Sequence, residues 1–218
     1  MVPAGRCAPR PDKPEVKGIE NREENCTIVY LGVVGALETA NNGRSGLVQI
    51  RETLSQPAYQ DVCAKTFSPY VWRSGLHYVL KHFPSHPGLL TQEELDRSPK
   101  VILAGHSMGG WAVVSLARNL KTRGIPVELS IQVDSVGITD ETVPDNVKAA
   151  AIFHARDILM FMTTKKIKAE KPGQTKLVAN VLVHGAGHES VTRDPRIREM
   201  VMDMIETLRA AAAPQPKI

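Results

Sequence analysis

The stretch that decides the fold is Val101-Ile102-Leu103-Ala104-Gly105-His106-Ser107-Met108-Gly109-Gly110, an apolar run that stops at a serine with a glycine two residues away on each side. The run favours a buried strand, and residues 111–121 have the apolar spacing of a helix. A sharp turn from strand to helix at Ser107 brings the flanking segments close together, which small residues such as Gly105 and Gly109 allow. The pattern therefore predicts a serine hydroxyl held above the end of a sheet.

A serine in such a turn has a helix N-terminus beside it. The backbone N–H of Met108 would then point toward the place where negative charge develops on an attacked carbonyl oxygen. A serine at its ordinary pKa is a weak nucleophile, so this chemistry also requires a base within hydrogen-bond reach and an acid that orients the base.

The candidate base is His188, which lies in the segment Val183-His-Gly-Ala-Gly-His-Glu189. A predicted strand ends there and a glycine-rich loop begins, so the loop can carry the imidazole back over the sheet edge toward Ser107. The competing residue is His184, which lies on the strand itself. The other histidines are interpreted as structural or surface groups, because none has metal-ligand spacing such as H-E-x-x-H, and we expect no metal and no cofactor.

Two aspartates are candidates for the acid, and both remain open. Asp134 directly follows the predicted strand 127–133, and Asp157 follows the strand that ends near His154. Both positions face the carboxyl edge of a parallel sheet, where active sites form. Asp134 is favoured because a compact loop follows it beside the strand of Ser107, whereas Asp157 opens an apparent helix that it could simply cap.

Strands and helices alternate along the chain. The predicted strands cover 27–34, 61–67, 101–106, 127–133, 149–154 and 177–184, and the predicted helices cover 44–54, 69–83, 111–121 and 195–211, with a short capped helix that begins at Thr91. Alternation of this kind predicts a parallel sheet covered on both faces. We expect one domain over residues 26–212, flanked by tails at 1–25 and 213–218.

Composition limits the partners. The chain has 218 residues, 42% hydrophobic and 23% charged, and no apolar run approaches the roughly eighteen residues of a membrane helix. The net charge is +4, but the basic residues are spread out without interleaved aromatics. We expect no nucleic-acid partner and no stable membrane insertion. The sequence carries no signal for the oligomeric state, and it favours a cytoplasmic location over export after removal of a leader.

The chain contains three cysteines. An odd count is typical of reduced thiols inside a cell, which is the expectation here. Cys26 and Cys63 would lie near the starts of neighbouring strands, so a bridge between them is sterically allowed.

The order of these motifs resembles the α/β-hydrolase superfamily over about residues 26–212. A strand leads to Gly105-His-Ser-Met-Gly109, an aspartate follows a later strand, and a histidine follows the last strand. The Gly-His-Ser-Met-Gly-Gly form is similar to that of lipases, esterases and thioesterases in the family. Val133-Asp134-Ser-Val is similar to the acid position of the lipase-like branch, while other branches place the acid one strand later, which keeps Asp157 open.

The resemblance implies a compact three-layer α/β/α sandwich. Its mostly parallel sheet would have six strands, in the spatial order second, first, third, fourth, fifth, sixth, without the two N-terminal strands of a full-size member. It also implies a second oxyanion donor in the loop after the first strand, where Val33 is the residue indicated by position beside Met108.

The implied activity is hydrolysis of carboxylic esters or thioesters through an acyl-enzyme, with Ser107 as nucleophile, His188 as base and Asp134 as acid. The substrate would be a small-molecule or lipid ester with a short or medium acyl chain, and residues 157–176 could form a small lid. Two alternatives remain: an acyltransferase or lipid deacylase that uses the same triad, and a non-catalytic binding protein with the hydrolase fold.

Overall fold

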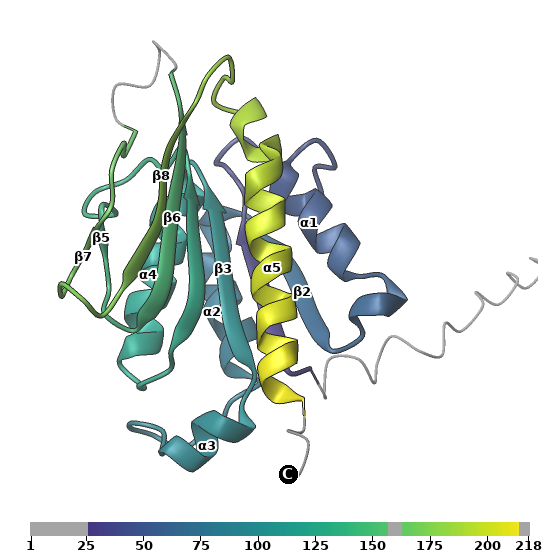
Figure 1. Ribbon diagram of the computed structural model, residues 1–218, viewed down its shortest axis with the longest axis vertical. Helices are drawn as coiled ribbons and strands as arrows, with labels where there is room; N and C mark the ends of the chain where they lie inside the picture. Colours follow the sequence, from purple (N-terminus) through teal and green to yellow (C-terminus); the bar gives the residue numbers. More distant parts are fainter. Residues whose placement is uncertain (1–25, 157–162, 214–218) are drawn as a thin grey trace, which may run out of the picture.

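Six parallel strands form one sheet in the centre of the molecule, in the order β2-β1-β3-β4-β6-β8. The computed structural model describes residues 26–156 and 163–213 (Figure 1). The strands are β1 (Ile28–Val33), β2 (Val62–Phe67), β3 (Lys100–His106), β4 (Val127–Val133), β6 (Val147–Ala155) and β8 (Lys176–Val183). The predicted parallel sheet and its strand order are confirmed.

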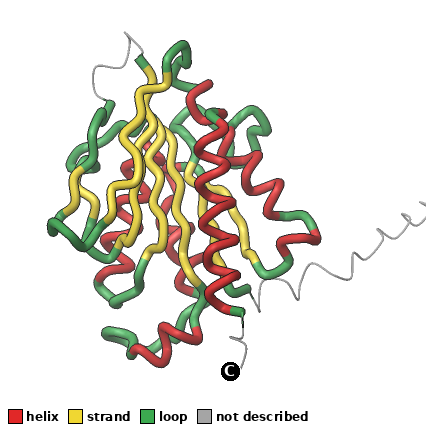
Figure 2. Tube along the Cα trace, viewed as in Figure 1, coloured by secondary structure: helices red, strands yellow, loops and turns green. Residues whose placement is uncertain are grey.

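Helices cover both faces of this sheet, as Figures 1 and 2 show. The helices α1 (Gly46–Leu54) and α5 (Pro195–Ala212) pack on one face, and α2 (Trp72–Leu80) and α4 (Met108–Lys121) pack on the other. Because successive strand residues point to opposite faces, Ile102 of β3 joins the first pair of helices and Leu103 joins the second. The two apolar clusters give the three-layer sandwich its core.

The short helix α3 (Gln92–Arg97) begins as its sequence predicts. Thr91 Oγ1 accepts from the backbone N of Glu94 at 3.3 Å, and Glu94 Oε2 accepts from the backbone N of Thr91 at 2.8 Å. The helix predicted over 69–83 is divided, because a 3₁₀ turn at Pro69–Val71 precedes α2. This difference arises at a helix end, where a local turn competes with the regular helix.

A second, two-stranded sheet lies beside the main one, and the sequence analysis did not predict it. Its parallel strands are β5 (Thr142–Val143) and β7 (Lys168–Ala169). Strands of two residues carry no detectable periodicity, and β7 falls within the segment 157–176 that the sequence indicates as a lid. The first part of that segment, residues 157–162, and the candidate acid Asp157 lie outside the described residues.

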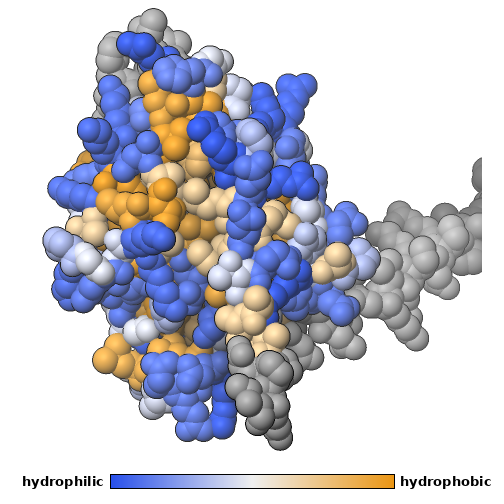
Figure 3. All heavy atoms as spheres, in the orientation of Figure 1, coloured by the Kyte–Doolittle hydropathy of each residue, from blue (hydrophilic) through white to orange (hydrophobic). Residues whose placement is uncertain are grey.

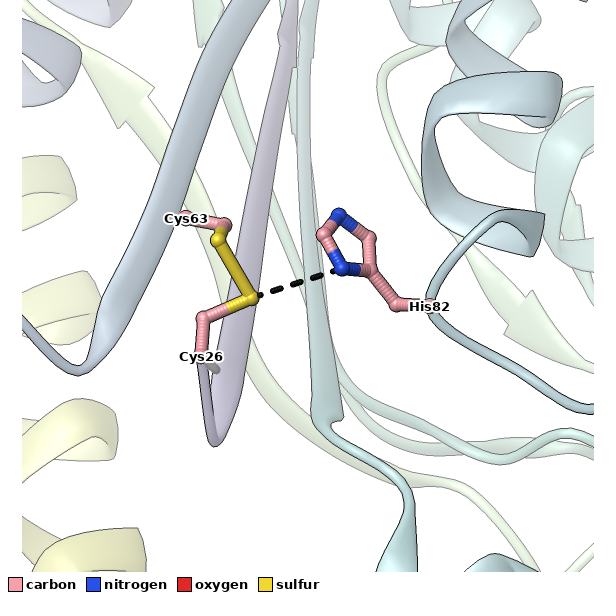
Figure 4. Close-up of side chains that lie close together, drawn as sticks. All are labelled: Cys26, Cys63 and His82. Carbon is pink, nitrogen blue, oxygen red and sulfur yellow. Dashed lines mark hydrogen bonds between the residues drawn. A yellow bond between two sulfur atoms is a disulfide. The ribbon is translucent and has the colours of Figure 1, made fainter. Parts of the chain in front are cut away.

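A disulfide joins Cys26 to Cys63 near the starts of β1 and β2 (Figure 4). Their Cα atoms are 5.6 Å apart, and His82 Nδ1 lies 3.6 Å from Cys26 Sγ. The expectation of reduced thiols is therefore wrong for these two cysteines. The parallel pairing of β1 with β2 sets the starts of the two strands side by side, with Ile28 opposite Val62, and Cys26 lies two residues before β1.

The edge strand β8 is the least covered strand of the sheet. Its residues Leu177 and Val178 are each 39% exposed, and Figure 3 shows apolar side chains at the surface over β6 and β8.

Of the helices in the described ranges, not one has the length and apolar character that crossing a membrane requires.

Candidate active site

Ser107 occupies a strained turn between β3 and α4. Its backbone angles are φ 55° and ψ −125°, a combination that residues other than glycine seldom adopt. Three backbone hydrogen bonds hold it there: Ser107 N donates to the Val133 carbonyl at 2.9 Å, and the Ser107 carbonyl accepts from Gly110 N at 2.9 Å and from Val136 N at 3.0 Å. The surrounding backbone thus fixes the turn that the sequence predicts.

Close approach of the backbone explains the glycines around Ser107. A Cβ atom on Gly105 would lie 2.1 Å from the Gly109 carbonyl oxygen, and one on Gly109 would lie 2.1 Å from the Val33 carbonyl oxygen. On Gly110 it would lie 2.2 Å from Ser135 Oγ. Each distance is far below van der Waals contact, so a side chain at any of the three would displace backbone or a neighbouring loop.

Asp134 follows β4 directly and is fully buried. Its Oδ2 lies 2.6 Å from His188 Nδ1, and its Oδ1 accepts from the backbone N of Ala155 at 3.1 Å. The backbone N of Asp134 donates to the Phe153 carbonyl at 2.7 Å. Both carboxylate oxygens therefore have a partner, and β6 fixes the orientation of the group toward His188.

His188 lies on the loop between β8 and α5, with its side chain 20% exposed. It shares with Ser107 and Met108 a pocket of about 680 Å³. Within the described part of the chain, no hydrogen bond joins Ser107 Oγ to the imidazole of His188. Catalytic hydrogen bonds are often long without substrate and tighten when it binds. The competing histidine, His184, is exposed and does not line this pocket.

Val33 is not placed where the sequence predicts. It is the last residue of β1, fully buried, and paired in register with Phe67 on one side and Gly105 on the other. Its backbone groups therefore belong to the sheet, and Val33 does not line the pocket, whose lining on this loop begins at Gly35. The predicted strand 27–34 already contains Val33, and the residue stays paired within the sheet instead of turning toward the pocket. Met108 does line the pocket, and as the first residue of α4 its N–H has no partner within the helix.

A second carboxylate–histidine pair lies beside the first. His106 Nδ1 is hydrogen-bonded to Glu38 Oε1, and His106 Nε2 lies 2.8 Å from the backbone carbonyl oxygen of His188. Burial raises the pKa of Glu38, but the hydrogen bond and the charge of His106 outweigh it, so the pKa of this carboxyl lies below its usual value. The sequence analysis missed this pair, because 68 positions separate its members and no motif includes Glu38.

In the described ranges, one group of three residues brings together side chains of the types that bind metal ions. The donor atoms of Cys26, Cys63 and His82 all lie within 4.8 Å of one another. The two sulfurs are bonded to each other in the disulfide, and the group lies at the end of the sheet where the strands begin, opposite Ser107. It takes no part in the pocket of His188.

The comparisons with known proteins find structural likeness alone. No family model matches the chain, and no curated protein matches it. The chain is similar in structure to a lipase-esterase related protein from Clostridium acetobutylicum, with a TM-score of 0.48, 10% identity, and coverage of 83% of this chain and 96% of that one. It is also similar to the RedJ thioesterase of the prodiginine pathway in Streptomyces coelicolor, with a TM-score of 0.48, 13% identity, and coverage of 94% and 91%. A third is Est1E from Butyrivibrio proteoclasticus, with a TM-score of 0.46, 15% identity, and coverage of 86% and 91%.

Proposed function

We propose that this chain is a serine hydrolase of carboxylic esters or thioesters, with Ser107 as nucleophile, His188 as general base and Asp134 as the acid that orients the base. The observation that carries the proposal is the 2.6 Å contact between Asp134 Oδ2 and His188 Nδ1, made at a pocket that Ser107 also lines. A carboxylate on Nδ1 selects the tautomer whose Nε2 is free to accept a proton.

The reaction divides into two acyl transfers. Ser107 Oγ attacks the carbonyl carbon of the ester while its proton passes to His188 Nε2, and the imidazolium then gives that proton to the departing alcohol or thiol. Water repeats the sequence on the acyl-serine, which releases the acid and restores the hydroxyl. Asp134 stabilises the imidazolium in both halves without taking its proton.

Backbone N–H groups would stabilise the negative charge that develops on the carbonyl oxygen. Met108 supplies one from the first turn of α4, where the helix dipole adds to the effect. We assign the second to the Gly35–Ala36 segment in place of Val33, because this segment is the first part of the loop after β1 to line the pocket.

The pocket favours an uncharged acyl group of moderate size. Its lining includes the apolar side chains of Ala36, Leu37, Met108 and Val136. Burial of apolar surface against them would contribute about 25 cal/mol for each Å² removed from water. With a volume near 680 Å³, the pocket suits a small-molecule or lipid ester with a short or medium acyl chain.

The experiment is hydrolysis of p-nitrophenyl butyrate together with labelling by a fluorophosphonate. We expect Ser107→Ala to lower kcat/KM by about 10⁴-fold or more and to abolish labelling. The matched control is Ser115→Ala, on the same helix two turns away, which should leave both unchanged. Full activity in Ser107→Ala would overturn the proposal, and a folded wild-type chain that neither hydrolyses esters nor labels would favour the binding-protein alternative.

A further inference from the structure

We propose that Glu38 and His106 form a positioning pair that holds the loop of His188 in place. The link is the hydrogen bond between His106 Nε2 and the His188 carbonyl oxygen, 2.8 Å long. The effect of the pair on turnover rests on the hydrolase function proposed above, whereas its effect on the loop does not.

The hydrogen bonds of its two ring nitrogens show that His106 is not itself a base. A backbone carbonyl oxygen only accepts hydrogen bonds, so Nε2 of His106 carries a proton and donates a hydrogen bond to the His188 carbonyl oxygen. Its other ring nitrogen is occupied by the carboxylate of Glu38. The imidazole next to Ser107 in the sequence thus has no free nitrogen for a proton from the serine, and its remaining role is mechanical.

The pair is buried enough to be rigid. The side chains of His106 and Glu38 are 2% and 9% exposed. A charge-assisted hydrogen bond gains strength in such surroundings, because little water competes for either group. The ring of His106 also lies against that of His188, with centroids 4.7 Å apart. His188 is therefore held at its main chain and ring by His106 and at Nδ1 by Asp134.

Glu38 connects this support to the other wall of the pocket. It lies on the loop after β1, where its backbone N donates to the Gly35 carbonyl at 3.0 Å. A Cβ on Gly35 would lie 2.9 Å from Glu38 Oε1 and 3.0 Å from His106 Nδ1, so the loop passes directly over the pair. The pair thereby joins the segment with the proposed oxyanion donor to the segment with the proposed base.

Two further hydrogen bonds join the chain after β1 to the chain after β8. The backbone N of Gly46 donates to Thr192 Oγ1 at 3.1 Å, and Arg193 Nη1 donates to the Arg44 carbonyl at 3.1 Å. Gly46, Thr192 and Arg44 do not line the pocket, whereas Glu38 does. Loss of the Glu38 charge should therefore loosen the loop near His188 while the outer contacts remain.

The test compares Glu38→Gln with Glu128→Gln. Glu128 is a matched control, since its carboxylate is 7% exposed and pairs with Lys148 at 2.8 Å on β4, outside the pocket. For p-nitrophenyl butyrate we expect Glu38→Gln to lower kcat about 10-fold with KM nearly unchanged, because misorientation of the base raises the barrier without weakening binding. Glu128→Gln should leave kcat unchanged even if its melting temperature falls as much.

Hydrogen–deuterium exchange supplies a readout that does not depend on turnover. Peptides that cover residues 185–191 should exchange faster in Glu38→Gln than in the wild type, and at the wild-type rate in Glu128→Gln. Unchanged kcat and unchanged exchange in Glu38→Gln would overturn the positioning role, as would equal losses of kcat in both variants. If the wild-type chain does not hydrolyse esters, the hydrolase proposal fails, and exchange alone then decides whether the pair holds the loop.

Discussion

Two carboxylate–histidine pairs flank Ser107, and the same two chemical groups have different surroundings in each. In the Asp134–His188 pair the imidazole is 20% exposed and lines the pocket. In the Glu38–His106 pair the imidazole is 2% exposed, and its second nitrogen is bonded to a backbone carbonyl. The partner of the second ring nitrogen thus decides whether each histidine can move protons.

The position of each histidine along its strand explains the difference. His106 is the last residue of β3, so its ring is held in the sheet layer under the loops. His188 comes five residues after the end of β8, on a loop that can carry its ring over the sheet edge. We therefore assign the supporting role to the strand residue and contact with substrate to the loop residue.

The largest expected effect separates the two histidines. We expect His188→Ala to lower kcat/KM by about 10⁴-fold or more, as loss of a catalytic base does. His106→Gln should lower kcat by only about 10-fold, through the position of His188. Both losses are measured by the kinetics of p-nitrophenyl butyrate hydrolysis, on variants whose melting temperatures have also been measured. Equal losses in the two variants would erase the distinction between base and support.

The next effect concerns the acid. Asp134→Asn keeps the shape of the side chain but favours the wrong tautomer of His188, so kcat should fall by about 10⁴-fold. Asp157→Asn provides the comparison, because Asp157 is the alternative acid from the sequence. A larger loss in Asp157→Asn than in Asp134→Asn would restore that alternative and would assign the contact at His188 a structural role.

The smallest effect is a change of stability with pH. Because the pKa of Glu38 is lowered by folding, its contribution to the free energy of unfolding is present above the unfolded-state pKa of about 4.3 and is lost as the pH falls through the folded-state pKa. The advantage in stability of the wild type over Glu38→Gln should therefore be smaller at pH 3 than at pH 7. Urea unfolding at pH 7 and at pH 3 measures this. An advantage of the same size at both pH values would contradict an ionised Glu38 in the folded chain.

Much of the fold could be predicted because its signals are local. The apolar run before Ser107 and the glycines beside it specify a strand, a tight turn and a helix, and alternation of such units leads to a parallel sheet. Asp134 and His188 could be chosen as candidates for the same reason, since each follows a strand and parallel strands end at one edge. The structure places those two side chains in contact.

The remaining features depend on contacts between distant parts of the chain. Nothing near Glu38 in the sequence indicates His106 as its partner, and the burial that makes the pair matter exists only in the folded chain. The pairing of Val33 on both sides, and the start of the pocket lining at Gly35, also depend on neighbouring strands and loops that the sequence does not show. The bridge between Cys26 and Cys63 likewise required the register of β1 against β2.

That bridge has one further consequence. It closes a span of 37 positions at the end of the sheet where the strands start, whereas Ser107 projects from the opposite end. A cross-link of this kind acts mainly by restricting the unfolded chain, and is typically worth about 2–4 kcal/mol. The cross-link and the proposed active site thus lie at opposite ends of the sheet, so the stability that the disulfide provides could be altered without a change to the pocket of Ser107.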